Sequence, residues 1–159
     1  MLRKLFLSLA LPMSLFFVSC KDNEEIAPKE QMVSGNVTLT QKSFTPTTFE
    51  NGQPTKAKIV QELNGTLNQI GSLTATLNVD FDLVNNKSGE VLATYVDKDG
   101  NKIYTTSSSV ANATGLSITE KITGGTGKFA NIKGGGAYFI NLNFTSGNGS
   151  GTLSWTVTY

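Results

Sequence analysis

The sequence predicts an all-β fold, an antiparallel closed barrel of seven to eight strands. Apolar and polar residues alternate in several segments, which places the side chains of each segment on two opposite faces, as in a strand. The chain has 16 glycines and 4 prolines, a mixture that suits short turns between strands. With 159 residues, of which 38% are hydrophobic, it can supply one modest core and hence one domain.

Residues 1–19 predict a signal peptide. Arg3 and Lys4 precede an apolar run over residues 5–18, which is too short for an ordinary membrane-spanning helix. The run ends in Phe17-Val18-Ser19-Cys20, which resembles the lipobox of bacterial lipoproteins. This resemblance implies cleavage before Cys20 and its modification by acyl chains such as palmitate, which attach the protein to a membrane. The alternative is an ordinary secretory signal with an incidental cysteine.

Residues 20–32 predict the lipidated cysteine followed by a disordered acidic tether. They are rich in charged residues and nearly lack apolar side chains. The run Lys21-Asp22-Asn23-Glu24-Glu25 also resembles the export signals of surface-exposed lipoproteins in some Gram-negative bacteria. We therefore expect attachment to the bacterial outer membrane and display at the cell surface. The alternative is a merely solvated linker and a position at the periplasmic face.

The charge of the processed chain excludes several kinds of partner. Loss of residues 1–19 removes Arg3 and Lys4, which leaves 11 lysines against 12 acidic residues and a net charge of −1. The remaining chain has no arginine and no histidine. Nucleic-acid binding is therefore not expected, and a bidentate phosphate site is not expected either. Because Cys20 is the only cysteine, we expect no disulfide and no catalytic thiol.

Residues 33–159 predict the barrel domain. Its first strand is expected at residues 33–40, where valine and leucine alternate with serine, asparagine and threonine. Residues 41–55, which include two prolines, predict a loop whose Phe44 and Phe49 pack back onto the domain. Residues 57–63 alternate again and predict the next strand.

Residues 73–84 give the clearest strand. Polar residues occupy every second position between the apolar ones, a period of two that a helix cannot produce. We expect one face of this strand to be buried. The predicted core face consists of Leu73, Ala75, Leu77, Val79, Phe81 and Leu83.

A turn and a hairpin are expected next. Residues 85–89 predict the turn, and residues 91–96 and 102–108 predict two strands that flank Asp97-Lys98-Asp99-Gly100-Asn101. The Asp-Gly pair favours a hairpin tip. A calcium loop is the alternative, but the later bidentate glutamate and the flanking helices are missing.

The glycine-rich residues 122–136 predict the corner around which the barrel turns. A strand at residues 116–122 enters it, and a strand at residues 137–144 leaves it. Residues 147–151 predict the last turn, and residues 153–159 the closing strand. Glycine permits sharp turns and close backbone approach. The corner itself is expected at Gly124, Gly125 and Gly127, with Phe129 as an apolar plug.

The stretch Ile122-Thr-Gly-Gly-Thr-Gly-Lys-Phe-Ala130, followed by Gly134, is similar to the glycine signature of the allene oxide cyclase and dirigent-like β-barrels. Leu63-Asn64-Gly65, Asp99-Gly100-Asn101 and the closing Gly-x-Leu-Ser-x-x-Val-x-Tyr support the resemblance, which covers residues 33–159. It implies an eight-stranded barrel that accommodates hydrophobic molecules. Dirigent sites use arginine and aspartate, and the processed domain has no arginine. The glycines do not match a phosphate loop, because no helical pattern follows them.

Glu120 is the most unusual candidate residue, because it lies between Ile118 and Ile122 on the apolar face of its strand. A carboxyl group in a dry barrel would have a raised pKa and could act as an acid or base. The alternative is that Glu120 lies at the barrel rim or pairs with Lys56 or Lys58.

Three further residues, Glu62, Tyr95 and Tyr104, are weaker candidates for a ligand-binding wall. The aromatic residues Tyr138, Trp155 and Tyr159 are expected to pack in the core or at the rim. No metal site and no cofactor are expected, because histidine and free cysteine are absent from the processed chain.

Two functions remain open at this point. The first is a lipid-anchored barrel that binds a small hydrophobic ligand or acts as a surface module. The second is a cofactor-independent isomerase or cyclase that acts on a hydrophobic substrate inside the barrel, which the family resemblance and Glu120 favour. An oligomer is compatible with either.

Overall fold

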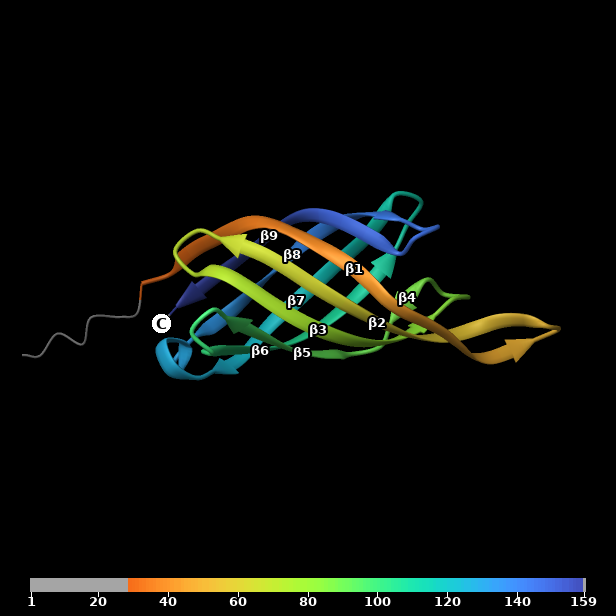
Figure 1. Ribbon diagram of the computed structural model, residues 1–159, viewed down its shortest axis with the longest axis horizontal. Coiled ribbons are helices and arrows are strands. Elements are labelled where there is room, and N and C mark those ends of the chain that lie inside the picture. The colour runs from red at the N-terminus through yellow and green to blue at the C-terminus, as the bar shows by residue number, and fades with distance from the viewer. Residues whose placement is uncertain (1–28, 159) are drawn as a thin grey trace, which may run out of the picture.

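The computed structural model describes residues 29–158, which form a β-barrel (Figure 1). The predicted signal peptide, Cys20 and residues 21–28 of the tether lie outside the described residues. The described part contains nine strands and one short 3-10 helix, η1. Their bounds are β1 Gln31–Glu50, β2 Gln53–Leu67, β3 Gly71–Asp82, β4 Lys87–Ser88, β5 Val91–Asp97, β6 Lys102–Ala111, β7 Gly115–Gly125, η1 Gly127–Phe129, β8 Lys133–Asn143 and β9 Asn148–Thr158.

All strands but β4 close into an eight-stranded antiparallel ring. Neighbours pair in the order β1-β2-β3-β5-β6-β7-β8-β9, and β9 pairs in turn with β1. The short β4 lies outside this ring and bridges β3 and β6 beyond the Val91 end of β5. The prediction of a closed antiparallel barrel is therefore confirmed, and closure removes the sheet edges that would otherwise be free.

Strand β3 shows how the alternating sequence builds the wall. Leu73, Ala75 and Val79 are buried, while the polar residues between them are exposed. Leu77 and Phe81 belong to the same face, but they are only half-buried. The predicted core face is confirmed, and its decreasing burial toward residue 81 indicates that the core does not fill that end of the barrel.

The opposite end is closed by η1 and the residues that follow it. Phe129 and Ile132 are buried and belong to the core, so the side chain of Phe129 packs inward from the glycine corner. The Lys128 ammonium lies 2.7 Å from the carboxylate of Asp97, the last residue of β5 before the turn to β6. Two motifs that are distant in the sequence, the glycine corner and the Asp-Gly hairpin tip, thus contact each other at the closed end.

Asp97 also orders the β5–β6 turn itself. Its Oδ1 accepts hydrogen bonds from the backbone N–H groups of Asp99 and Asn101, both at 2.9 Å. The Lys128 ammonium, together with these donors, holds the pKa of Asp97 well below its ordinary value of 3.8. Residues 97–101 therefore form the hairpin tip that the sequence predicts.

Glycine is required in the corner, and Gly127 and Gly134 show why. Gly127 has φ +59°, and a Cβ there would overlap the side chain of Asn101. Gly134 has φ +128°, and a Cβ there would overlap the backbone carbonyl of Thr156 on β9. Side chains at these positions would be both strained and obstructed. The corner lies between β7 and β8, as predicted.

The prediction of a loop at residues 41–55 is wrong. This segment is a β-hairpin in which β1 and β2 continue past the barrel, with register from Ser43↔Val60 to Glu50↔Gln53 (Figure 1). A two-residue turn at Asn51 and Gly52, with φ +49° and +77°, reverses the chain. The prolines do not break the strands, because Pro46 lies where β9 no longer pairs with β1.

Other differences from the sequence expectation are small. The last turn lies at residues 144–147, and residues 148–151 already belong to β9. The first strand begins at Gln31, which pairs with Val157, so the end of the predicted tether is ordered strand. The turn expected at residues 85–89 contains the short strand β4.

Candidate functional site

Glu120 lies on β7 inside the closed half of the barrel, where its carboxylate accepts four hydrogen bonds. Oε1 accepts from the hydroxyl groups of Tyr95 at 2.9 Å and Thr105 at 2.6 Å. Oε2 accepts from the Tyr138 hydroxyl at 3.2 Å and from Trp155 Nε1 at 3.1 Å. The four donors come from β5, β6, β8 and β9, so the carboxylate connects five strands across the barrel interior.

Burial raises the pKa values of the acidic groups in this cluster. Glu120 is 4% exposed, and burial raises its pKa above 4.5, while the four donors act in the opposite direction. Burial, together with the neighbouring Tyr138 and Glu120, also raises the pKa of Tyr95 well above 10. Burial and the neighbouring Glu120 also raise the pKa of the Tyr138 hydroxyl. The phenols therefore remain protonated and act as donors at neutral pH.

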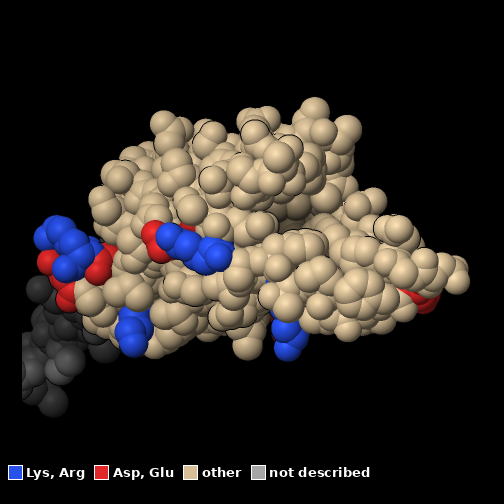
Figure 2. Space-filling model, turned by 45° about the vertical axis from the view of Figure 1, so that its right-hand side comes forward, with Lys and Arg blue, Asp and Glu red and all other residues tan. Residues whose placement is uncertain are grey.

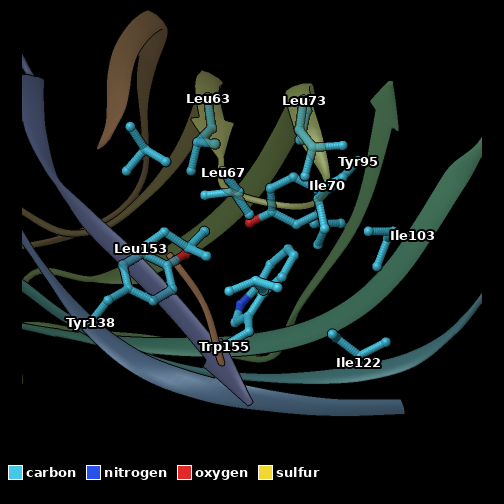
Figure 3. Close-up of a cluster of buried hydrophobic side chains, with 14 of the residues drawn as sticks. Leu63, Leu67, Ile70, Leu73, Tyr95, Ile103, Ile122, Tyr138, Leu153 and Trp155 are labelled. Atoms are coloured by element: carbon cyan, nitrogen blue, oxygen red, sulfur yellow. The ribbon is translucent and has the colours of Figure 1, made fainter. Parts of the chain in front are cut away.

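Buried hydrophobic side chains fill this half of the barrel, and Figure 3 shows Tyr95, Tyr138 and Trp155, three of the four donors to Glu120, within that cluster. The rings of Tyr95 and Trp155 meet edge to face, with centroids 5.2 Å apart and planes at 87°. Leu63, Leu73 and Ile103 are buried in the same cluster. Neither sequence-based alternative for Glu120 is correct: it does not lie at the rim, and its four partners are neutral donors and not Lys56 or Lys58.

The sequence-predicted wall residues separate into two groups. Tyr95 is buried and donates to Glu120 in the filled half, and it is not among the residues that line the cavity described below. Glu62 is wrong as an interior residue, because its carboxylate pairs at 3.1 Å with Lys42 and both side chains are more than 40% exposed. Tyr104 is also wrong, since its side chain is exposed on the outer face of β6. Each of these two residues alternates with buried neighbours, which places it on the solvent side.

Sequence reasoning missed Thr105 as a partner of Glu120 and treated Tyr138 and Trp155 only as packing residues. Packing is confirmed for both aromatic residues, which are 9% and 0% exposed, but both also donate hydrogen bonds. A signal was present in the residue types: a glutamate on an apolar face requires donors, and inward-facing Tyr, Thr and Trp are the groups that could supply them.

A cavity of about 440 Å³ occupies the other half of the barrel, at the end opposite η1. Its lining is mostly apolar, and none of the lining residues carries a charge. Glu120 is not among the lining residues. Apolar lining residues from β1, β2, β3 and β8, together with the turn that follows β8, include Phe44, Ile59, Val79, Phe81, Leu142 and Phe144.

Side-chain size explains why the space is open at this end. Along the inward face of β6, Ile103 and Thr105 lie in the filled half, and Ser109 and Ala111 line the cavity. Small side chains at the last two positions leave room that neighbouring strands do not fill. The change along one strand thus marks the border between core and cavity.

The rim of the cavity exposes aromatic side chains. Phe44, at the base of the β1–β2 hairpin, and Phe144, after β8, line the cavity and are 44% and 55% exposed. Phe49, farther along the hairpin, is 58% exposed, so the expectation that it packs back onto the domain is wrong. Charged side chains are few and scattered on the face shown in Figure 2. The open end therefore presents apolar surface around an uncharged opening.

The described residues offer neither a metal cluster nor a membrane-spanning helix. In residues 29–158, no cluster of three or more His, Cys, Asp or Glu side chains is placed to hold a metal ion. The described residues also contain no helix with the length and apolar character needed to cross a membrane.

Comparison with family models, curated proteins and solved structures finds no match for this chain.

Proposed function

We propose that this protein is a lipid-anchored binding module that holds a small, uncharged hydrophobic ligand in the open half of its barrel. The observation that carries the proposal is the cavity of about 440 Å³ with a mostly apolar, uncharged lining. Small-molecule sites typically measure about 300–1,000 Å³ and combine apolar walls with a few polar groups. The exposed aromatic rim extends the apolar surface that an entering ligand would meet.

The position of the chain start supports this arrangement. β1 begins at Gln31 at the closed end, and it reaches the cavity only at Gln41 (Figure 1). A lipid on Cys20 would therefore attach the barrel through its closed end, and the opening would be directed away from the attachment point. We propose the outer leaflet of the bacterial outer membrane as the location, on the basis of the lipobox and the acidic residues that follow it.

Two observations favour binding over the alternative isomerase or cyclase. Glu120, the candidate acid or base, is enclosed in the filled half and does not line the cavity. The cavity lining itself contains only amide, hydroxyl and apolar side chains, and none of these groups is a general acid or base near neutral pH. A carboxylate that already accepts four hydrogen bonds is better suited to holding the strands together than to proton transfer.

Binding can be tested with the uncharged fluorescent probe N-phenyl-1-naphthylamine. We expect its fluorescence to rise when it enters the cavity, and we expect Ser109→Trp to abolish that rise by filling the space. Ser108→Trp is the matched control, because Ser108 is exposed on the opposite face of β6. Equal binding by both variants, each verified as folded by circular dichroism, would refute the proposed site.

Anchoring is tested separately in cells. A clickable fatty acid should label the full chain and not its Cys20→Ala variant. Protease added to intact cells should then remove the domain if it is displayed at the surface. A labelled but protected domain would place the protein at the periplasmic face.

A further inference from the structure

The cavity contains one buried polar side chain whose hydrogen-bonding groups are not used by the protein. Gln61 on β2 is 7% exposed and lines the cavity. Its side-chain amide makes no hydrogen bond with any of the described side chains or backbone groups. No fully buried side-chain polar atom of the described residues lacks a partner, so the Gln61 amide must be reached from the open space of the cavity. Because this amide is open to the cavity and has no protein partner, it is available to a polar group of a ligand that replaces the water around it.

Gln61 marks the floor of the cavity. Along β2 the next inward residue is Leu63, which belongs to the filled core, and the previous one is Ile59, which lines the cavity wall. Across the sheet, Gln61 is paired in register with Gln41 on β1, whose side chain also lines the cavity. The Gln41 amide lies close to Gly147 of the turn that follows β8, so the Gln61 amide is the polar group at the bottom, with apolar walls above it.

We propose that the ligand is an uncharged amphiphile that enters with its polar group first and places a hydroxyl or amide group against Gln61. This inference rests on the proposed binding function and specifies its ligand. A primary amide offers two N–H donors and one carbonyl acceptor, so a group that both donates and accepts complements it best. The tail then extends past the apolar walls toward Phe44 and Phe144 at the rim.

The same lining disfavours charged lipids. A carboxylate at the floor would lose its hydration without gaining a cation, because no lysine or arginine is among the described lining residues. A fatty acid should therefore bind more weakly than an alcohol of equal length. An alkane fits the walls but leaves the Gln61 amide unpaired, so it should also bind more weakly.

The experiment compares three ligands with the same ten-carbon chain: 1-decanol, decane and decanoate at pH 8. Each competes with N-phenyl-1-naphthylamine for the wild-type barrel and for Gln61→Leu. We expect 1-decanol to be the best competitor, and Gln61→Leu to weaken it about tenfold, which corresponds to one lost hydrogen bond of about 1.4 kcal/mol. Decane should compete equally well or better against the variant. Gln53→Leu, an exposed glutamine on the same strand, should change nothing.

The outcomes separate the two proposals. If the probe binds wild type but Gln61→Leu leaves the preference for 1-decanol unchanged, the role of Gln61 is refuted while the binding function stands. Stronger competition by decanoate than by 1-decanol would also overturn the uncharged ligand class. Failure of the probe and of all three ligands to bind folded wild type would instead refute the proposed function itself.

Discussion

The two halves of this barrel are built from the same strands but differ in what fills them. Near η1, Trp155, Tyr95 and Glu120 occupy the interior and connect five strands by hydrogen bonds. Toward the β1–β2 hairpin, Ser109 and Ala111 leave a cavity whose rim is aromatic and exposed. The comparison shows that a period-two pattern determines which side chains face inward, while their sizes determine whether the interior is a core or a binding space.

Truncation of one aromatic residue in each half should give the largest contrast. Trp155→Ala is expected to lower the free energy of unfolding by about 3–5 kcal/mol, because the indole is fully buried and also donates to Glu120. Phe144→Ala should cost less than about 1 kcal/mol, since more than half of that ring is exposed. Urea unfolding measures both. Similar losses would contradict the division into a filled half and an open half.

Glu120→Leu should be the next most damaging change. It leaves four buried donors without an acceptor, and each unpaired group costs roughly 1–3 kcal/mol, so a loss of at least about 3 kcal/mol is expected. Glu120→Gln should cost much less. Its carbonyl can face Trp155 and Tyr138, while its amide N–H groups donate to the hydroxyls of Tyr95 and Thr105.

The two Glu120 variants are compared by urea unfolding at one pH. Because glutamine and leucine both remove the charge, the difference between them isolates hydrogen bonding. If leucine is tolerated as well as glutamine, the four bonds do not stabilise the closed half.

Glycine positions in the two halves should also differ. Gly134→Ala places a methyl group against the Thr156 carbonyl at φ +128°, so β8 must move away from β9. We expect a loss above about 2 kcal/mol and a lower melting temperature. Gly52→Ala at the hairpin tip has open space around it and carries only the conformational cost of φ +77°, about 1–2 kcal/mol. A larger loss at Gly52 would reverse this order.

The pH dependence of stability should be the smallest effect. Because the pKa of Glu120 is raised in the folded barrel, the folded state keeps a proton that the unfolded chain releases above pH 4.5. Stability should therefore fall as pH rises from 4.5 through the folded pKa, and Glu120→Gln should remove this decrease. Asp97 acts with the opposite sign and in a separate range, since its lowered pKa makes stability fall only as pH drops below 3.8. A wild-type stability that rises with pH above 4.5 would contradict the Glu120 effect.

Much of the fold could be predicted because local chemistry decides it. The alternation from Leu73 to Phe81 specifies an extended strand with one buried face. The glycine corner specifies a sharp turn with positive φ angles. The β1–β2 hairpin was not predicted, because Pro46 and Pro54 are typical of loops when read locally. They are tolerated in this hairpin because the strands extend past their neighbours in the ring.

The site was less predictable than the fold. The position of Glu120 on an apolar face was readable, but its partners lie 15 to 35 residues away in the chain and depend on the barrel register. The cavity could not be predicted from the sequence for the same reason. Whether Gln61 faces a core or an opening depends on the size of side chains on strands that lie across the barrel from it.

The location of the first strand has a practical consequence. Since the described chain starts at the plugged end, immobilising the domain through its N-terminus on a bead, a sensor chip or a supported bilayer leaves the entrance unobstructed. Ligand exchange could then be followed on the attached molecule, without release from its support.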